Sequence, residues 1–142
     1  MINVTGTTNK KLLAYIERVS AYLGVQDVDI DIVKSCAADA GGYCDGDAEW
    51  CNIEIARNDA VGKIPMYQLM INIAHEMVHA SQILTGRLVN KGMVMRYDFN
   101  VPVGLSFQWI WEGNVYTDVA YDDHPWEIEA YELEEKVYNI CK

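Results

Sequence analysis

The sequence lacks any apolar stretch long enough to cross a membrane, and it lacks a recognisable leader. No apolar run approaches the ~20 residues that a transmembrane helix needs. Residues 1–11 also lack the basic region and following apolar stretch of a secretory signal peptide. We therefore expect neither a membrane span nor a leader, and we take the cytoplasm as the default location.

Positive charge is scarce. The 142 residues contain 11 Lys and Arg against 21 Asp and Glu, which gives a net charge of −10. No basic side chain occurs between Arg96 and Lys136, where ten acidic residues lie. This balance argues against nucleic acid as a partner. The acidic run indicates a solvated face, and a cleft that favours cationic peptides stays open as an alternative.

Cysteine pairs with zinc-ribbon spacing are also missing. The four cysteines are Cys36, Cys44, Cys51 and Cys141, and none belongs to a C-x-x-C pair. We expect free thiols, which are often buried and which fit the cytoplasmic default. A disulfide between Cys36 and Cys44, or between Cys44 and Cys51, stays open at this point.

Only three histidines are present, and two of them form the pattern H-E-x-x-H at residues 75–79. On a helix, His75 and His79 lie one turn apart on the same face, so both imidazoles can reach one Zn²⁺. Glu76 lies close enough to accept a proton from a metal-bound water. The pattern therefore predicts a zinc site with Glu76 as the catalytic base.

The segment around this pattern reads as one largely buried helix from Pro65 to Gly86. Pro65 suits the first helical turn and Gly86 suits the C-terminal cap. Apolar residues recur at helical spacing: Met66, Leu69, Met70, Ile73, Met77 and Ala80. Polar side chains beside a core need partners, and a metal ion supplies one for two imidazoles.

The remaining pattern predicts a single α+β domain over residues 1–142. A helix capped by Thr7 or Thr8 should run to about Leu23, with a strand at 28–33 and one or two more within 43–56. Residues 106–120 predict a hairpin with its turn at 112–114. A last helix should have Asp123 or Asp122 as its cap and Pro125 in its first turn, and it should end near Ile140. Gly92, Pro102 and Gly104 interrupt residues 87–105, and either a short strand or irregular structure stays open for residues 93–99.

A catalytic zinc site usually has three protein ligands and one open position. The longer pattern with a third histidine after glycine is absent, because Gln82 and Thr85 stand at those positions. The third ligand must therefore come from elsewhere. His124 is the only other histidine, and Glu127 and Glu129 follow it on the last helix.

Three motifs occur in order: H-E-x-x-H-x-x-Q at 75–82, W-x-G at 111–113 with Tyr116, and P-x-E-x-E-A at 125–130. Over roughly residues 43–135 the chain thereby resembles the gluzincin metallopeptidases, in particular minigluzincins and metallopeptidases encoded by bacteriophages. The resemblance implies a zincin-like domain, with a small mixed or antiparallel sheet packed on the H-E-x-x-H helix. A hairpin and a C-terminal helix that supplies the third ligand would complete it. Glu127 matches the clan's E-x-x-A pattern, ahead of Glu129 and then His124, although Tyr131 replaces the expected Asp or Asn.

The resemblance further implies a peptidase with one Zn²⁺ per chain that acts on peptide or protein substrates, in the host cytoplasm if a phage encodes it. Tyr121, Tyr116 and His124 are candidate donors to the oxyanion. The strand carrying Asn52, Ile53 and Glu54 is expected to be the edge that pairs with extended substrate. The alternative is a catalytically weak zinc domain that binds a protein or peptide as a regulatory module.

Overall fold

A four-stranded mixed sheet forms one layer of the molecule. The computed structural model describes residues 1–142. The strands are β1 (Ile2–Thr5), β2 (Val28–Val33), β3 (Gly42–Gly46) and β4 (Cys51–Ala56), in the order β1-β2-β4-β3. β1, β2 and β4 run parallel, and β3 runs antiparallel to β4. The sheet is therefore mixed, which is one of the two forms expected.

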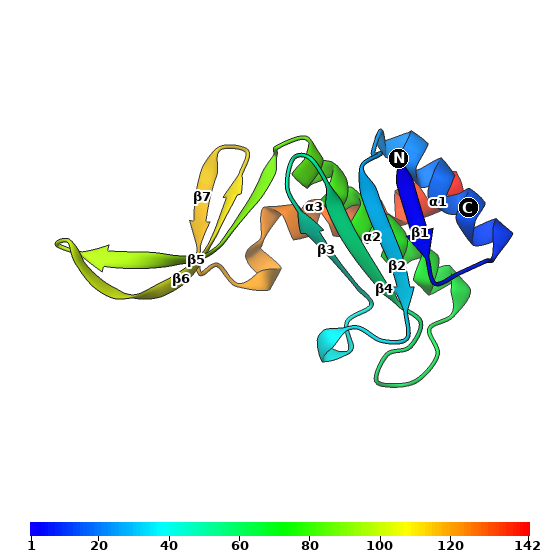
Figure 1. Ribbon diagram of the computed structural model, residues 1–142, viewed down its shortest axis with the longest axis horizontal. Coiled ribbons are helices and arrows are strands. Elements are labelled where there is room, and N and C mark those ends of the chain that lie inside the picture. The colour runs from blue at the N-terminus through cyan, green and yellow to red at the C-terminus, as the bar shows by residue number, and fades with distance from the viewer.

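Side-chain alternation explains why helices cover only one face of this sheet. In β2, Val28, Ile30 and Ile32 are buried, whereas Asp29 and Asp31 point the other way. Helices α1 (Lys10–Leu23), α2 (Met66–Leu84) and α3 (Pro125–Cys141) lie on the apolar side (Figure 1). The result is a mixed α+β domain with its core between the helices and the sheet. No helix combines the length and the apolar character that crossing a membrane requires.

The helix ends agree with expectation at three places and differ at two. Gly24 ends α1 in the left-handed conformation, Gly86 does so just beyond α2, and Pro125 begins α3. Asn9, not Thr7 or Thr8, caps α1, because its side chain accepts the hydrogen bond from the Leu12 N–H. Asp122 and Asp123 do not cap α3, since they lie in a preceding 3₁₀ turn and His124 occupies the cap position.

A second, three-stranded antiparallel sheet projects from the first layer (Figure 1). It contains β5 (Leu88–Asp98), β6 (Val101–Trp111) and β7 (Asn114–Thr117). The predicted hairpin is confirmed as β6 and β7, with its turn at Glu112 and Gly113. The unclear stretch at 87–105 forms β5 and the first half of β6, joined by a two-residue turn at Phe99 and Asn100. Both turn residues have positive φ, as a primed hairpin turn requires.

The position of β4 corrects one expectation. Asn52, Ile53 and Glu54 do not lie on an edge strand, because β4 pairs with β2 on one side and with β3 on the other. Whether a strand lies at the edge depends on the order of the strands in the sheet, which the local sequence pattern does not encode. The edge nearest α2 is β3, whose outer backbone groups pair with no other strand.

Candidate metal centre

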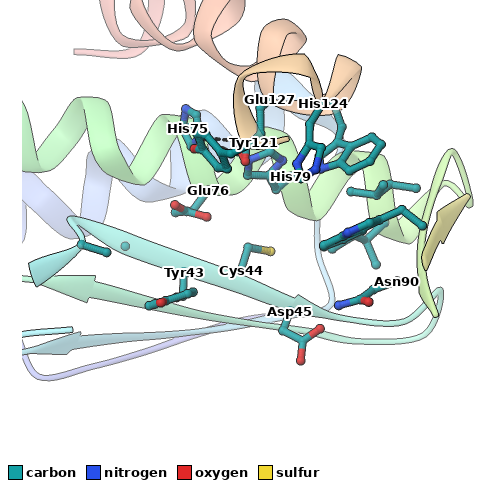
Figure 2. A pocket seen from close by; sticks show the side chains of 16 residues that line it. Tyr43, Cys44, Asp45, His75, Glu76, His79, Asn90, Tyr121, His124 and Glu127 are labelled. Carbon is teal, nitrogen blue, oxygen red and sulfur yellow. Dashed lines mark hydrogen bonds and ion pairs between the residues drawn. The ribbon is translucent and has the colours of Figure 1, made fainter. Parts of the chain in front are cut away.

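His75 and His79 lie one turn apart on α2, and Glu127 faces them from the first turn of α3 (Figure 2). The His75 Nε2 atom lies 3.2 Å from the His79 Nε2 atom. The Glu127 Oε1 atom lies 3.0 Å from the first of these nitrogens and 2.7 Å from the second. All three residues are buried. They form a group that could hold a metal ion.

The other nitrogen of each imidazole is held by a separate partner. His75 Nδ1 lies 2.7 Å from a Glu134 carboxylate oxygen, and His79 Nδ1 lies 2.8 Å from the Gln82 Oε1 atom. Because both partner atoms are acceptors, each Nδ1 carries the proton and donates it. Each Nε2 then faces Glu127, where it offers a lone pair to a metal ion when unprotonated and donates to the carboxylate when protonated. Such outer partners of ligating histidines orient the rings and raise their basicity.

The three facing atoms are spaced as metal ligands are. Ligand atoms ~2.0 Å from a tetrahedral ion lie roughly 3.3 Å apart, close to the observed separations. When both Nε2 atoms are unprotonated, they and the carboxylate oxygen repel one another, and a cation between them would remove this repulsion. The donor set therefore suits a metal ion without rearrangement of the helices.

Glu129 and His124, the two alternative ligands, are engaged elsewhere. The Glu129 carboxylate accepts two hydrogen bonds from Arg87, at 2.8 and 2.6 Å, and one from Gln82 at 3.1 Å. His124 stacks on Trp126 with ring centroids 4.4 Å apart, and its Nε2 donates to the Val119 carbonyl at 2.8 Å. Of the three candidates, only Glu127 reaches the two histidines.

Glu76 lies beside the ligand group on the side that faces the sheet, and its side chain points towards β3 (Figure 2). The residue is 8% exposed, and its carboxylate, which makes no hydrogen bond to the protein, keeps its accessible surface in the hollows that it lines. Gly42 makes room for it: a Cβ atom there would come within 3.0 Å of the Glu76 Cγ atom and of the Glu54 carbonyl oxygen. The sheet thus holds a free carboxylate next to the candidate metal position.

Burial, hydrogen bonds and neighbouring charges shift the pKa values of the histidines and carboxylates of the site. Burial alone would lower the pKa of both histidines, but hydrogen bonds to Glu127 and the charges of Glu76 and Glu127 outweigh it and raise the pKa of each. Burial raises the pKa of Glu76, although the histidines oppose this. For Glu127, hydrogen bonds from both imidazoles outweigh burial and lower the pKa to about 2. Glu127 therefore stays ionised, and Glu76 is the more basic carboxylate.

The three candidate oxyanion donors have different positions. Tyr121 lines the pocket, and its hydroxyl lies 3.2 Å from that of Tyr131. Burial, that hydrogen bond and the charge of Glu127 raise the pKa of Tyr121, which keeps the phenol protonated as a donor. His124 also lines the pocket. Tyr116 packs against Trp126 at 5.6 Å between ring centroids and is not brought to the site.

Sequence reasoning missed Glu134 and Tyr131 as parts of the site. Tyr131 packs on the His75 ring with centroids 4.7 Å apart. Glu134 lies seven residues after Glu127, so helical spacing places both on one face of α3. The same spacing could have identified Glu134.

The two disulfides that the sequence left as alternatives do not form, because all four cysteines are free.

Two hollows meet at the ligand group. The first, about 380 Å³, has apolar walls from Ile83, Leu88, Trp109 and Trp126. The second, about 400 Å³, has polar walls from Gln68, Asn72 and Glu134. Both share Gly42, His75, Glu76 and Tyr121, and neither is lined by Lys or Arg. The site is therefore a groove that crosses the ligand group, with one apolar and one polar half.

Comparisons with protein-family models, curated proteins and solved structures found no match.

Proposed function

We propose that this protein is a zinc-dependent peptidase of the gluzincin-like type, with His75, His79 and Glu127 as ligands and Glu76 as general base. The observation that carries the proposal is Glu76, a largely buried residue whose carboxylate has no hydrogen-bond partner in the protein and lies beside three converging candidate ligand atoms. A metal that only joins helices needs no base at its side. A carboxylate kept free there supports a reaction on water.

The donor set supports zinc as the metal. Two histidines and one carboxylate form a common catalytic zinc set that leaves a position open to solvent or substrate. When bound, zinc would act as a Lewis acid that activates water and polarises a carbonyl group. Glu134 and Gln82 would hold the two imidazoles with Nε2 directed at the ion. One ion per chain satisfies this arrangement.

The residues around the groove have separate roles in the proposed hydrolysis. Glu76 accepts a proton from the attacking water and returns it to the departing amine, so its raised pKa suits both transfers. The Tyr121 hydroxyl donates a hydrogen bond to the carbonyl oxygen as negative charge develops there. The outer edge of β3 offers unpaired backbone groups to an extended peptide. We therefore assign pairing with the substrate to β3 in place of β4.

The test combines metal content with cleavage of casein and of a peptide library. The wild-type protein should hold one zinc per chain and cleave peptide bonds. Glu76→Gln should keep the zinc and lose cleavage, because it preserves shape while removing the base. Glu54→Gln, on the other face of the sheet, serves as the matched control and should cleave normally. Unchanged cleavage in Glu76→Gln would refute the proposal, and zinc binding without any cleavage in the wild type would favour the regulatory binding module instead.

A further inference from the structure

An exposed apolar surface that the proposed chemistry does not explain lies on the β5–β6 hairpin. Residues 91–108, called the arm from here on, extend away from the helices and the first sheet (Figure 1). Met93 is 50% exposed, Met95 47%, and Leu105 and Phe107 55% each. A two-stranded ribbon with exposed apolar side chains gains little stability from them, and a contiguous patch of this kind marks a binding surface.

The strand register places these side chains on one face of the arm. Met93 pairs with Phe107, and Met95 pairs with Leu105. Directly opposed residues in an antiparallel pair share a face. The opposite face is formed by the pairs Gly92–Gln108, Val94–Ser106 and Arg96–Gly104. The arm is therefore apolar on one side and mostly small or polar on the other.

The apolar face continues into the wall of the metal groove. Trp109 is two residues beyond Phe107 in β6, so its side chain lies on the same face. Asn90, its partner in β5, shares that face. Both Asn90 and Trp109 line the apolar half of the groove. A bulge between Asn90 and Gly92, where Gly92 has a φ of +65°, re-aims the ribbon at this junction.

Charge argues against two other occupants of this face. A second copy of the chain would bring together two molecules of net charge −10. An anionic membrane surface would repel the same charge. A polypeptide that already lies in the groove meets no such penalty, and the groove leads directly onto the arm.

We propose that the apolar face of the arm binds the substrate polypeptide on the N-terminal side of the cleaved bond. This inference rests on the proposed peptidase function. It assigns an extended, unfolded chain as the substrate class, with apolar side chains upstream of the cleavage point. From Trp109 to Leu105 the strand spans roughly 13 Å, so the contact needs about four substrate residues beyond the groove.

The edge strand β3 sets the direction. Antiparallel pairing is the more stable arrangement, and it would place the substrate N-terminus towards the Gly46 end of β3. Cys44 and Asp45, near that end, line the apolar half of the groove together with Trp109. At the other end, Gly42 lines both halves, and Gly41, just before the strand, lines only the polar half. The upstream residues of the substrate therefore approach the arm.

The test measures peptide binding and cleavage separately. The probes are two fluorescent 14-residue peptides with the same central sequence, one with alternating Leu and Phe in its N-terminal half and one with Ser at those positions. Fluorescence anisotropy with the zinc-loaded Glu76→Gln variant gives affinity without cleavage. The apolar peptide should bind at least tenfold more tightly. Leu105→Ser/Phe107→Ser should remove this preference, whereas Val94→Ser/Gln108→Ser, on the opposite face, should keep it.

Folding and zinc content of each variant are checked by circular dichroism and metal analysis. An equal affinity of the two peptides for a folded protein would overturn the arm proposal, even if short peptides are still cleaved. A dimer that the arm variants dissociate, with peptide binding unchanged, would overturn it as well. If apolar peptides bind through the arm but the wild-type protein cleaves nothing, the arm proposal stands as a binding function and the peptidase proposal fails.

Discussion

Under the proposed ligand assignment, replacing Glu127 by Gln should remove most of the stabilisation that bound zinc would give to the fold, whereas the same change at Glu129 should not. Glu127 Oε1 lies within 3.0 Å of both histidine Nε2 atoms, and Glu129 is instead held by Arg87. A glutamine keeps the size of the side chain but removes its charge. Its amide oxygen is a poor zinc ligand, so we expect the affinity to fall by at least ~100-fold, the upper end of losses seen for outer partners.

The size of the effect follows from binding linkage. At a zinc concentration ~100 times the Kd, binding adds about 2.7 kcal/mol to the free energy of unfolding of the wild type. For a chain of this length that corresponds to a rise in Tm of roughly 8 °C. With a Kd 100-fold weaker, the same zinc concentration adds only about 0.4 kcal/mol, or roughly 1 °C.

Glu129→Gln provides the matched control. Its partner Arg87 is 38% exposed, so the loss of this ion pair should cost no more than ~1 kcal/mol. That cost should appear equally with and without zinc, and the zinc-induced rise in Tm should remain near its wild-type value. The assay is thermal unfolding of each variant with zinc and with a chelator. The ligand assignment would be refuted if zinc raised the Tm of Glu127→Gln by the full wild-type amount and did not raise the Tm of Glu129→Gln.

Three further outcomes are expected. Gly42→Ala should reduce kcat at least tenfold with zinc content unchanged, because the added methyl group displaces Glu76; unchanged kcat would contradict this packing. Tyr121→Phe should lower kcat by roughly 10²-fold, as for the loss of one oxyanion donor, whereas Tyr116→Phe should have no effect. In chelator, thermal unfolding should show a stability maximum between pH 4.5 and 6.5. The two histidines have raised pKa values in the folded protein, so they stabilise it below pH 6.5 and lose this effect as the pH rises. Glu127 has a lowered pKa, so its stabilising contribution is lost as the pH falls from 4.5 towards 2. A maximum above pH 7 would contradict this reasoning.

Local sequence pattern was sufficient for α2, which carries the two histidines of the candidate metal centre. The periodicity around His75 and His79 predicted α2, with Pro65 at its start and Gly86 beyond its end. The turn at Glu112 and Gly113 was also predicted from residue type. These features depend on interactions between residues close in sequence, which is why a single sequence reveals them.

The arm could not be predicted in the same way. Gly92, Pro102 and Gly104 read as breakers, yet all three lie in strands. Gly92 sits at a bulge, and Pro102 lies where β6 pairs only with β5, so its missing N–H costs no ladder bond on the other side. The order β1-β2-β4-β3 likewise depends on pairing across long sequence separations, which a local pattern does not record.

A continuous set of polar contacts ties the ligand group to the base of the arm. Gln82, which holds His79, also donates to Glu129, and Glu129 binds Arg87. Arg87 directly precedes β5, bonds Glu112 in the β6–β7 turn and lies 4.6 Å over the Trp111 ring. Because the same residues orient an imidazole and hold the base of the hairpin, the arm has a defined position relative to the candidate metal centre. A bound polypeptide would thereby be aligned with Glu76 by the network that positions the ligands.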